Sequence, residues 1–176
     1  MNEIVKKNGI KFGVIAGILA SLITLIIYIV DIKLFISWWV GILSIVIFVG
    51  LCLYLMATTK KALINNFSFK DAFTTFFIFI VIAIIISTFT KIVLFNIIDT
   101  DAKTAVSDLT IDYTVGVLKK FNTPTEIIKQ SVEEMQKNNP LNVFQLIKGS
   151  FFQIAIYSIF GLILAAIFKS KPKEQF

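Results

Sequence analysis

Hydrophobic residues fall in four long runs along this 176-residue chain, at positions 12–30, 35–56, 73–95 and 149–168. A helix rises about 1.5 Å per residue and the hydrocarbon core of a bilayer is about 30 Å thick, so about 20 apolar residues make one crossing. The pattern therefore predicts an all-α, polytopic membrane protein with four transmembrane helices.

A longer and more polar connection, residues 96–148, separates the third and fourth runs. It divides at Thr123-Pro124, where Thr123 is expected to cap a new helix and Pro124 to occupy its first position. We expect a short amphipathic helical insertion between helices three and four, within a single domain covering residues 1–176.

Each half of this connection has one apolar face. Before the break, the face consists of Val106, Leu109, Tyr113 and Val117. After the break, the candidate partner face consists of Ile128, Val132 and Met135. Such faces can pack together as a cap over the bundle, lie in the membrane interface, or bind a partner. The cap is the preferred interpretation.

Composition supports membrane residence and excludes several kinds of site. Hydrophobic residues make up 57% of the chain and charged residues 16%, with a mean hydropathy of +0.86. Histidine is absent and Cys52 is the single cysteine, which removes the usual transition-metal ligands and the commonest general base. No glycine-rich nucleotide loop occurs. We expect no enzymatic activity, no cofactor and no metal site.

The net charge of +6 comes from lysines that flank the apolar runs. Nine of them fall on the side that carries both chain ends and the second connection: Lys6, Lys7, Lys11, Lys60, Lys61, Lys70, Lys169, Lys171 and Lys173. Because positively charged short loops stay in the cytoplasm, both termini are predicted to be cytoplasmic and residues 96–148 extracytoplasmic. The lysines form no basic patch, so no nucleic acid is expected as a partner.

Small residues recur at every fourth position of the first helix, at Gly9, Gly13, Gly17 and Ser21. This small-residue strip permits close approach of another helix. Gly161 and Ala165 form a shorter version in the fourth helix and are a plausible mate. The neighbour is either within the chain or in a second copy, and the intramolecular partner is preferred.

Polar residues inside the apolar runs are few. Ser87, Thr88 and Lys91 lie near the outer end of helix three, and Gln153 lies at a similar depth in helix four. They can line an outward-facing polar vestibule. In the alternative interpretation, which we prefer, Lys91 extends to the headgroups and the hydroxyls bond to their own backbone.

Three short segments give the chain a family resemblance. They are NGIKFG at residues 8–13, FKDAF at residues 69–73 and GLILAAIFK at residues 161–169. The chain resembles a bacterial four-helix membrane family catalogued as domain of unknown function 4199. The resemblance implies the topology and residence in the bacterial cytoplasmic (inner) membrane. It implies no activity and no functional residues.

Two functions remain open. The first is a non-enzymatic structural or accessory protein that docks a second copy or another membrane protein through the strip or the outer connection. The alternative is a small oligomeric transporter or channel with a polar outer vestibule. In both cases the lipid bilayer is the constant partner.

Overall fold

A computed structural model of the protein describes residues 2–64 and 66–170, and every secondary-structure element in these ranges is a helix. In chain order the elements are α1 (Glu3–Val30), the 3-10 helix η1 (Ile32–Ile36), α2 (Trp38–Ala62), α3 (Phe69–Val93), the π-helix η2 (Leu94–Ile98), α4 (Thr100–Lys120), α5 (Thr125–Lys137) and α6 (Val143–Phe168). The all-α prediction is confirmed. Lys171 and Lys173, used above to predict orientation, lie outside the described residues.

Four helices are long and apolar enough to cross a membrane: α1, α2, α3 continued through η2, and α6. All four extend past the apolar run that predicted them, at one end or at both, since a helix continues once its backbone is hydrogen-bonded. At the start of α1, for example, the Ile4 amide donates to Oδ1 of the N-cap Asn2 over 2.9 Å. The second begins later than its run, because Phe35 belongs to η1.

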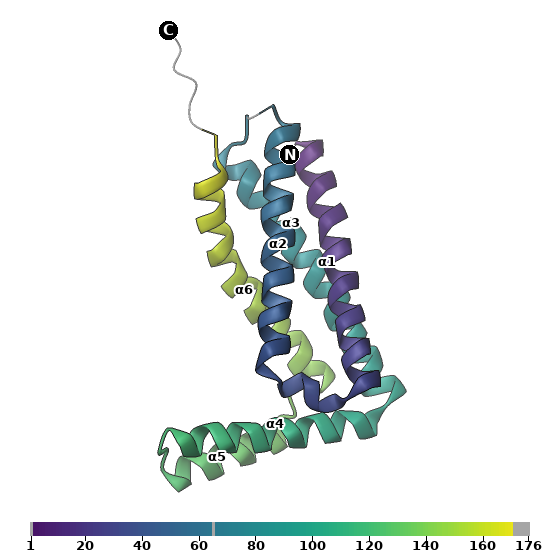
Figure 1. The fold of residues 1–176 in the computed structure, drawn as a ribbon, viewed down its shortest axis with the longest axis vertical. Coiled ribbons are helices and arrows are strands. Elements are labelled where there is room, and N and C mark those ends of the chain that lie inside the picture. Colours follow the sequence, from purple (N-terminus) through teal and green to yellow (C-terminus); the bar gives the residue numbers. More distant parts are fainter. Residues whose placement is uncertain (1, 65, 171–176) are drawn as a thin grey trace.

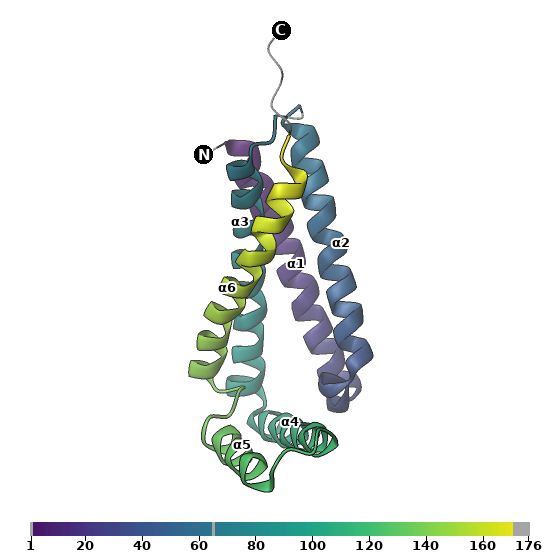
Figure 2. The ribbon, with the colours of Figure 1, turned by 90° about the vertical axis from the view of Figure 1, so that its left-hand side faces the viewer.

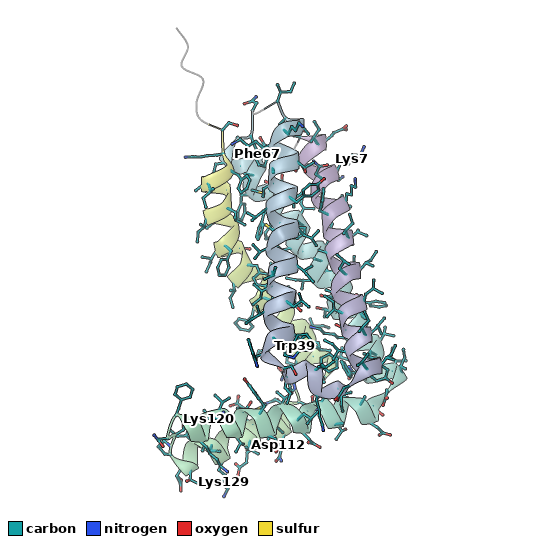
Figure 3. The ribbon with its side chains drawn as sticks, viewed as in Figure 1. Lys7, Trp39, Phe67, Asp112, Lys120 and Lys129 are labelled. Carbon is teal, nitrogen blue, oxygen red and sulfur yellow. The ribbon has the colours of Figure 1, made fainter. Side chains whose placement is uncertain are left out.

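The four spanning helices form a bundle, and α4 and α5 lie across one end of it, roughly perpendicular to the bundle axis (Figures 1 and 2). We call α4, the connecting residues 121–124 and α5 the transverse hairpin, and this end of the bundle the hairpin end. The first helix begins, and α6 ends, at the opposite, terminal end (Figure 1). Figure 3 shows Lys7 and Phe67 at the terminal end and Lys120 and Lys129 on the hairpin.

The third helix is the centre of the bundle, because α1 and α6 both pack along it. Its buried side chains include Phe76, Phe79 and Ile80, each at most 1% exposed. At the terminal end, the loop before α3 is joined to the end of α6. The Ser170 amide donates to the Phe67 carbonyl over 2.8 Å, and the Phe67 amide donates to the Ser170 hydroxyl over 2.9 Å.

The small-residue strip of α1 faces α3. The sequence had suggested Gly161 and Ala165 of α6 as its mate, and this prediction is wrong. A Cβ added at Gly9, Gly13 or Gly17 would lie 2.7–2.9 Å from the Cβ of Ile78, Ile82 or Ile86, respectively. Further along α1, Ser21 and Thr90 share a hydrogen bond of 2.7 Å between their hydroxyl oxygens. The strip is therefore covered within the chain.

The shorter strip in α6 also faces α3. A Cβ at Gly161 would lie 2.5 Å from Cδ1 of Phe76, and Ala165 is completely buried in the same cluster of core side chains. The two strips thus meet the same central helix from different sides. The physical reason is that α3 offers large side chains, isoleucines toward α1 and phenylalanine toward α6, which fill the space that glycine leaves.

The first connection contains the 3-10 helix η1, and α1 packs more extensively on α3 than on α2. One local prediction needs correction. In the hairpin, Pro124 occupies the N-cap position of α5 and Thr123 precedes it, because Pro124 has extended backbone angles (φ −54°, ψ 140°). Ser68 caps α3, where its hydroxyl accepts a hydrogen bond of 3.0 Å from the Asp71 amide.

The first half of α4 is fixed to the hairpin end of the bundle. Val106 is buried with Leu94 and Phe95 of η2, and Phe35 of η1 packs against this cluster. Asp99 caps α4: its carboxylate accepts from the Ala102 amide over 2.8 Å and from the Tyr28 hydroxyl over 2.7 Å. A contact from α1 therefore positions the start of α4.

These hydrogen bonds make the position of α4 sensitive to acid. The Ala102 amide first, and then the Tyr28 hydroxyl, hold the pKa of the Asp99 carboxyl below its usual value. The charged carboxylate therefore stabilises the fold above its usual pKa, about 4, and this contribution is lost as the pH falls through the lowered pKa.

We expect Asp99→Asn, which retains a capping oxygen, to remove this part of the pH dependence. The measurement is amide hydrogen exchange in α4 between about pH 5 and pH 2, relative to wild type at each pH. The exposed Asp112→Asn is the control and should follow wild type. Identical pH profiles for wild type and Asp99→Asn would contradict the role of the charged cap.

Candidate functional site

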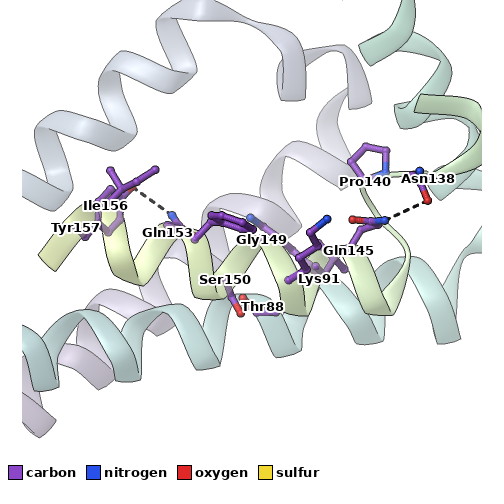
Figure 4. A pocket seen from close by; sticks show the side chains of 13 residues that line it. Thr88, Lys91, Asn138, Pro140, Gln145, Gly149, Ser150, Gln153, Ile156 and Tyr157 are labelled. Atoms are coloured by element: carbon purple, nitrogen blue, oxygen red, sulfur yellow. Dashed lines mark hydrogen bonds between the residues drawn. The ribbon is translucent and has the colours of Figure 1, made fainter. Parts of the chain in front are cut away.

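A polar pocket of about 650 Å³ lies between α3 and α6 near the hairpin end (Figure 4). Thr88 and Lys91 line it from α3, and Lys148, Ser150 and Gln153 line it from α6. The segment between α5 and α6 closes it with Asn138 and Pro140. The structure therefore brings polar side chains from distant parts of the chain to one place.

The four residues of the predicted vestibule divide between this pocket and a second cavity. Thr88 lines the polar pocket, and Ser87, one position earlier, faces the second cavity. Lys91 and Gln153 line both. The predicted grouping is thus present, but it lies at the boundary between two spaces of different character.

The second space is an apolar cavity of about 750 Å³ enclosed by α1, η1, α2, α3 and α6. Its wall includes Ile23, Phe48, Ala83 and Leu164 from four different helices. Because α2 and α6 make little contact, the space between them is not filled by side chains. The exposed Ile45 of α2 lies in its wall, so the cavity is open toward the lipid-facing surface.

The electrostatics of the polar pocket are one-sided. Lys91 and Lys148 are the charged residues that line it, and no aspartate or glutamate does so. Lys91 is half-buried, and none of the acidic side chains in the described ranges forms an ion pair with it. Two ammonium groups with side-chain amides beside them favour binding of an anion.

The hydroxyl groups of this region mostly bond to their own helix. Ser87 donates to the Ile84 carbonyl over 3.2 Å, and Ser150 donates to the Ile147 carbonyl over 2.7 Å. Gln153 donates instead to the Tyr157 hydroxyl over 3.2 Å (Figure 4). The Ser87 and Ser150 hydroxyls therefore need no ligand to be satisfied, and the two lysines and the amides carry most of the binding capacity.

Sequence reasoning missed Lys148, Gln145 and Tyr157. The fourth helix was predicted from its apolar run alone, which begins at residue 149, whereas α6 begins at Val143. The signal was the spacing of Gln145 and Lys148, which are three residues apart and so share a helical face in the segment before the apolar run.

The candidate partner face of α5 is partly occupied within the chain. Ile128, Val132 and Met135 are half-buried on the helix that packs beside α4, while the charged residues of α5 are exposed. On α4 the predicted face is correct at Val106, which is buried, but Tyr113 is 49% exposed. The difference arises because the second half of α4 extends past the bundle (Figure 1).

Nothing in the described ranges gathers three or more histidine, cysteine or carboxylate side chains where they could hold a metal ion. Cys52 is buried in the core of the bundle. The polar pocket offers positive charge and hydrogen-bond donors.

Comparison with known proteins gives one match. A family model described as Protein of unknown function (DUF4199) matches residues 11–170. No curated protein and no solved structure matches the chain.

Proposed function

The chain belongs to the family described as Protein of unknown function (DUF4199), and we propose that it is a non-enzymatic accessory protein of the bacterial cytoplasmic membrane that docks another membrane protein. The transverse hairpin carries this proposal. It is the largest part of the chain outside the spanning helices, and only its first half is fixed to the bundle.

The free half of the hairpin presents a mixed surface at the level of the membrane surface. Phe121 at its tip is 79% exposed, and Lys119, Lys120 and Lys129 are exposed around it. Because α4 and α5 run across the bundle, this surface extends sideways over the position of a neighbour in the membrane (Figure 1). An exposed aromatic residue with flanking charges is typical of a protein contact.

The proposed orientation places this hairpin outside the cell and both termini in the cytoplasm. The lysine-rich segments at Lys6, Lys7, Lys60, Lys61 and Lys70 belong to the terminal end of the bundle. The positive-inside tendency then supports a cytoplasmic terminal end.

Amine crosslinking in intact membranes tests the docking surface. We expect a discrete adduct between this chain and a second protein through Lys119, Lys120 or Lys129, identified by mass spectrometry of the linked peptides. Changing all three to arginine retains their charge but removes the reactive amine, so the adduct should disappear. Lys33→Arg, at the same end of the bundle but outside the hairpin, should leave it unchanged.

A reversal of charge at these three positions provides the second readout. Their replacement by glutamate should release the bound protein on purification while the chain still inserts in the membrane. Retention of the same protein by this variant, or links that never involve the hairpin, would contradict the proposal.

A small oligomeric transporter or channel is the second candidate, and the polar pocket with Lys91 and Gln153 favours it. The two candidates differ in assembly, because a chain with four spanning helices would form a shared path between copies. The mass of the protein in nanodiscs separates them: a ring of three or more copies supports the transporter, and a monomer or dimer supports the accessory protein.

A further inference from the structure

The polar pocket and the apolar cavity share one part of their walls. Lys91, Gln153 and Tyr157 line both spaces, so the two are adjacent and meet beside the Lys91 side chain. One space has positive charge and hydrogen-bond donors, and the other is mostly apolar away from this shared wall. A molecule that fills both must have an anionic head and a hydrocarbon chain.

We propose that the two cavities together bind one anionic phospholipid of the surrounding bilayer. Its phosphate lies in the polar pocket against Lys91 and Lys148, and one acyl chain enters the apolar cavity between α2, α3 and α6. This inference concerns the spanning helices and is independent of any protein docked on the hairpin.

The depth of Lys91 suits a lipid phosphate. It lies seven residues before the end of the spanning segment at Ile98, which is about 10 Å along a helix. A lysine at this depth extends toward the headgroup level. Lys148 belongs to the first two turns of α6 and adds a second positive charge from the other helix.

The charge of the pocket selects among lipids. Its lining holds two lysines and no carboxylate, so an anionic phosphodiester gains charge-assisted hydrogen bonds there. In a zwitterionic lipid the head also carries a positively charged ammonium group, which is quaternary in phosphatidylcholine, and the two lysines repel it. An anionic lipid is therefore expected to bind more tightly than a zwitterionic one with the same chains.

The apolar cavity suits the acyl chain of a bilayer lipid and not a soluble ligand. Its volume of about 750 Å³ is in the range of small-molecule sites, about 300–1,000 Å³. It is open toward the surface where Ile45 and Ile163 are exposed, so a chain can enter sideways from the membrane. In its wall, a Cβ added at Gly41 would meet no other atom within 4 Å.

Native mass spectrometry of the protein in mild detergent measures the head preference. With phosphatidylglycerol and phosphatidylcholine of identical chains added separately, we expect one tightly bound phosphatidylglycerol and about tenfold weaker binding of phosphatidylcholine. Lys91→Gln should reduce the preference to about twofold or less, and Lys91→Arg should retain it. Lys120→Gln, on the exposed hairpin surface, is the control and should behave as wild type.

Two glycines in α2 test the proposed site of the acyl chain. Gly41→Leu places a side chain in the apolar cavity and should weaken binding of both lipids. Gly50→Leu adds the same side chain to the same helix, also where nothing lies within 4 Å, but at a position that lines neither cavity, and should have no effect.

Any of four results overturns the proposal. Equal binding of the two lipids by wild type, or an unchanged preference in Lys91→Gln, would remove the phosphate site. Equal effects of Gly41→Leu and Gly50→Leu on lipid binding would contradict an acyl-chain site in the apolar cavity. Displacement of the lipid by millimolar glycerol phosphate would identify a soluble phosphate ester, and not a lipid, as the ligand. Lys91→Arg retains the charge, so it shows whether an effect of Lys91→Gln comes from the lost charge or from a disturbed fold.

Discussion

Replacing Gly13 with leucine should separate α1 from α3 and lower the free energy of unfolding by about 3 kcal/mol. A Cβ at this position would lie 2.9 Å from the carbonyl oxygen of Phe79 and 2.9 Å from the Cβ of Ile82. Both atoms belong to or adjoin the backbone of α3, so no rotation of a side chain relieves the clash. The stability of the variant can be measured by SDS-induced unfolding in mixed micelles, followed by circular dichroism.

Gly50→Leu is the matched control, because its added side chain meets nothing within 4 Å. Leucine has a higher helix propensity than glycine, so this variant should be as stable as wild type or slightly more stable. The native mass should be the same in both variants, since Gly13 contacts α3 of its own chain. Loss of an oligomer without loss of folding stability in Gly13→Leu would contradict the structure.

Phe76→Ala should lower the free energy of unfolding by on the order of 3 kcal/mol. The Phe76 ring is 1% exposed and lies against Gly161 of α6, so its removal leaves a cavity between the central helix and α6. In a membrane the loss consists mainly of packing contacts, because lipid and protein interior are equally apolar. The same SDS titration measures it.

The control is Phe89→Ala, which removes the same side chain from the same helix at a position that is 66% exposed. This ring faces lipid, so its removal should change stability by less than about 0.5 kcal/mol. Leucine at Gly161 should partly restore the Phe76→Ala variant, since it adds volume where the ring was lost. Equal effects of the two alanine substitutions would show that α6 does not depend on Phe76.

Local patterns predicted the elements of this fold well. The four apolar runs and the break near Pro124 depend on residues close in sequence, and the structure contains each of them, with the cap of α5 displaced by one residue. The start of α6 was predicted too late, because Gln145 and Lys148 interrupt the apolar run without interrupting the helix.

The candidate site was predictable only in part. Lys91 and Gln153 were recognised because polar residues are rare in a spanning helix, and the structure places both in one pocket. Their separation from Ser87, and the addition of Lys148, depend on how α3 and α6 are rotated against each other. That rotation is set by contacts such as Phe76 with Gly161, which lie far apart in the sequence.

The sequence by itself determined that this chain crosses a membrane four times and carries a helical insertion between its last two crossings, because hydropathy and helical period are properties of neighbouring residues. Only the tertiary structure decided which helix each glycine faces, that α3 is the centre, and that the apolar cavity meets the polar pocket at Lys91. In lipid, apolar side chains gain little from burial as such, so the fit of surfaces between distant helices sets these neighbours.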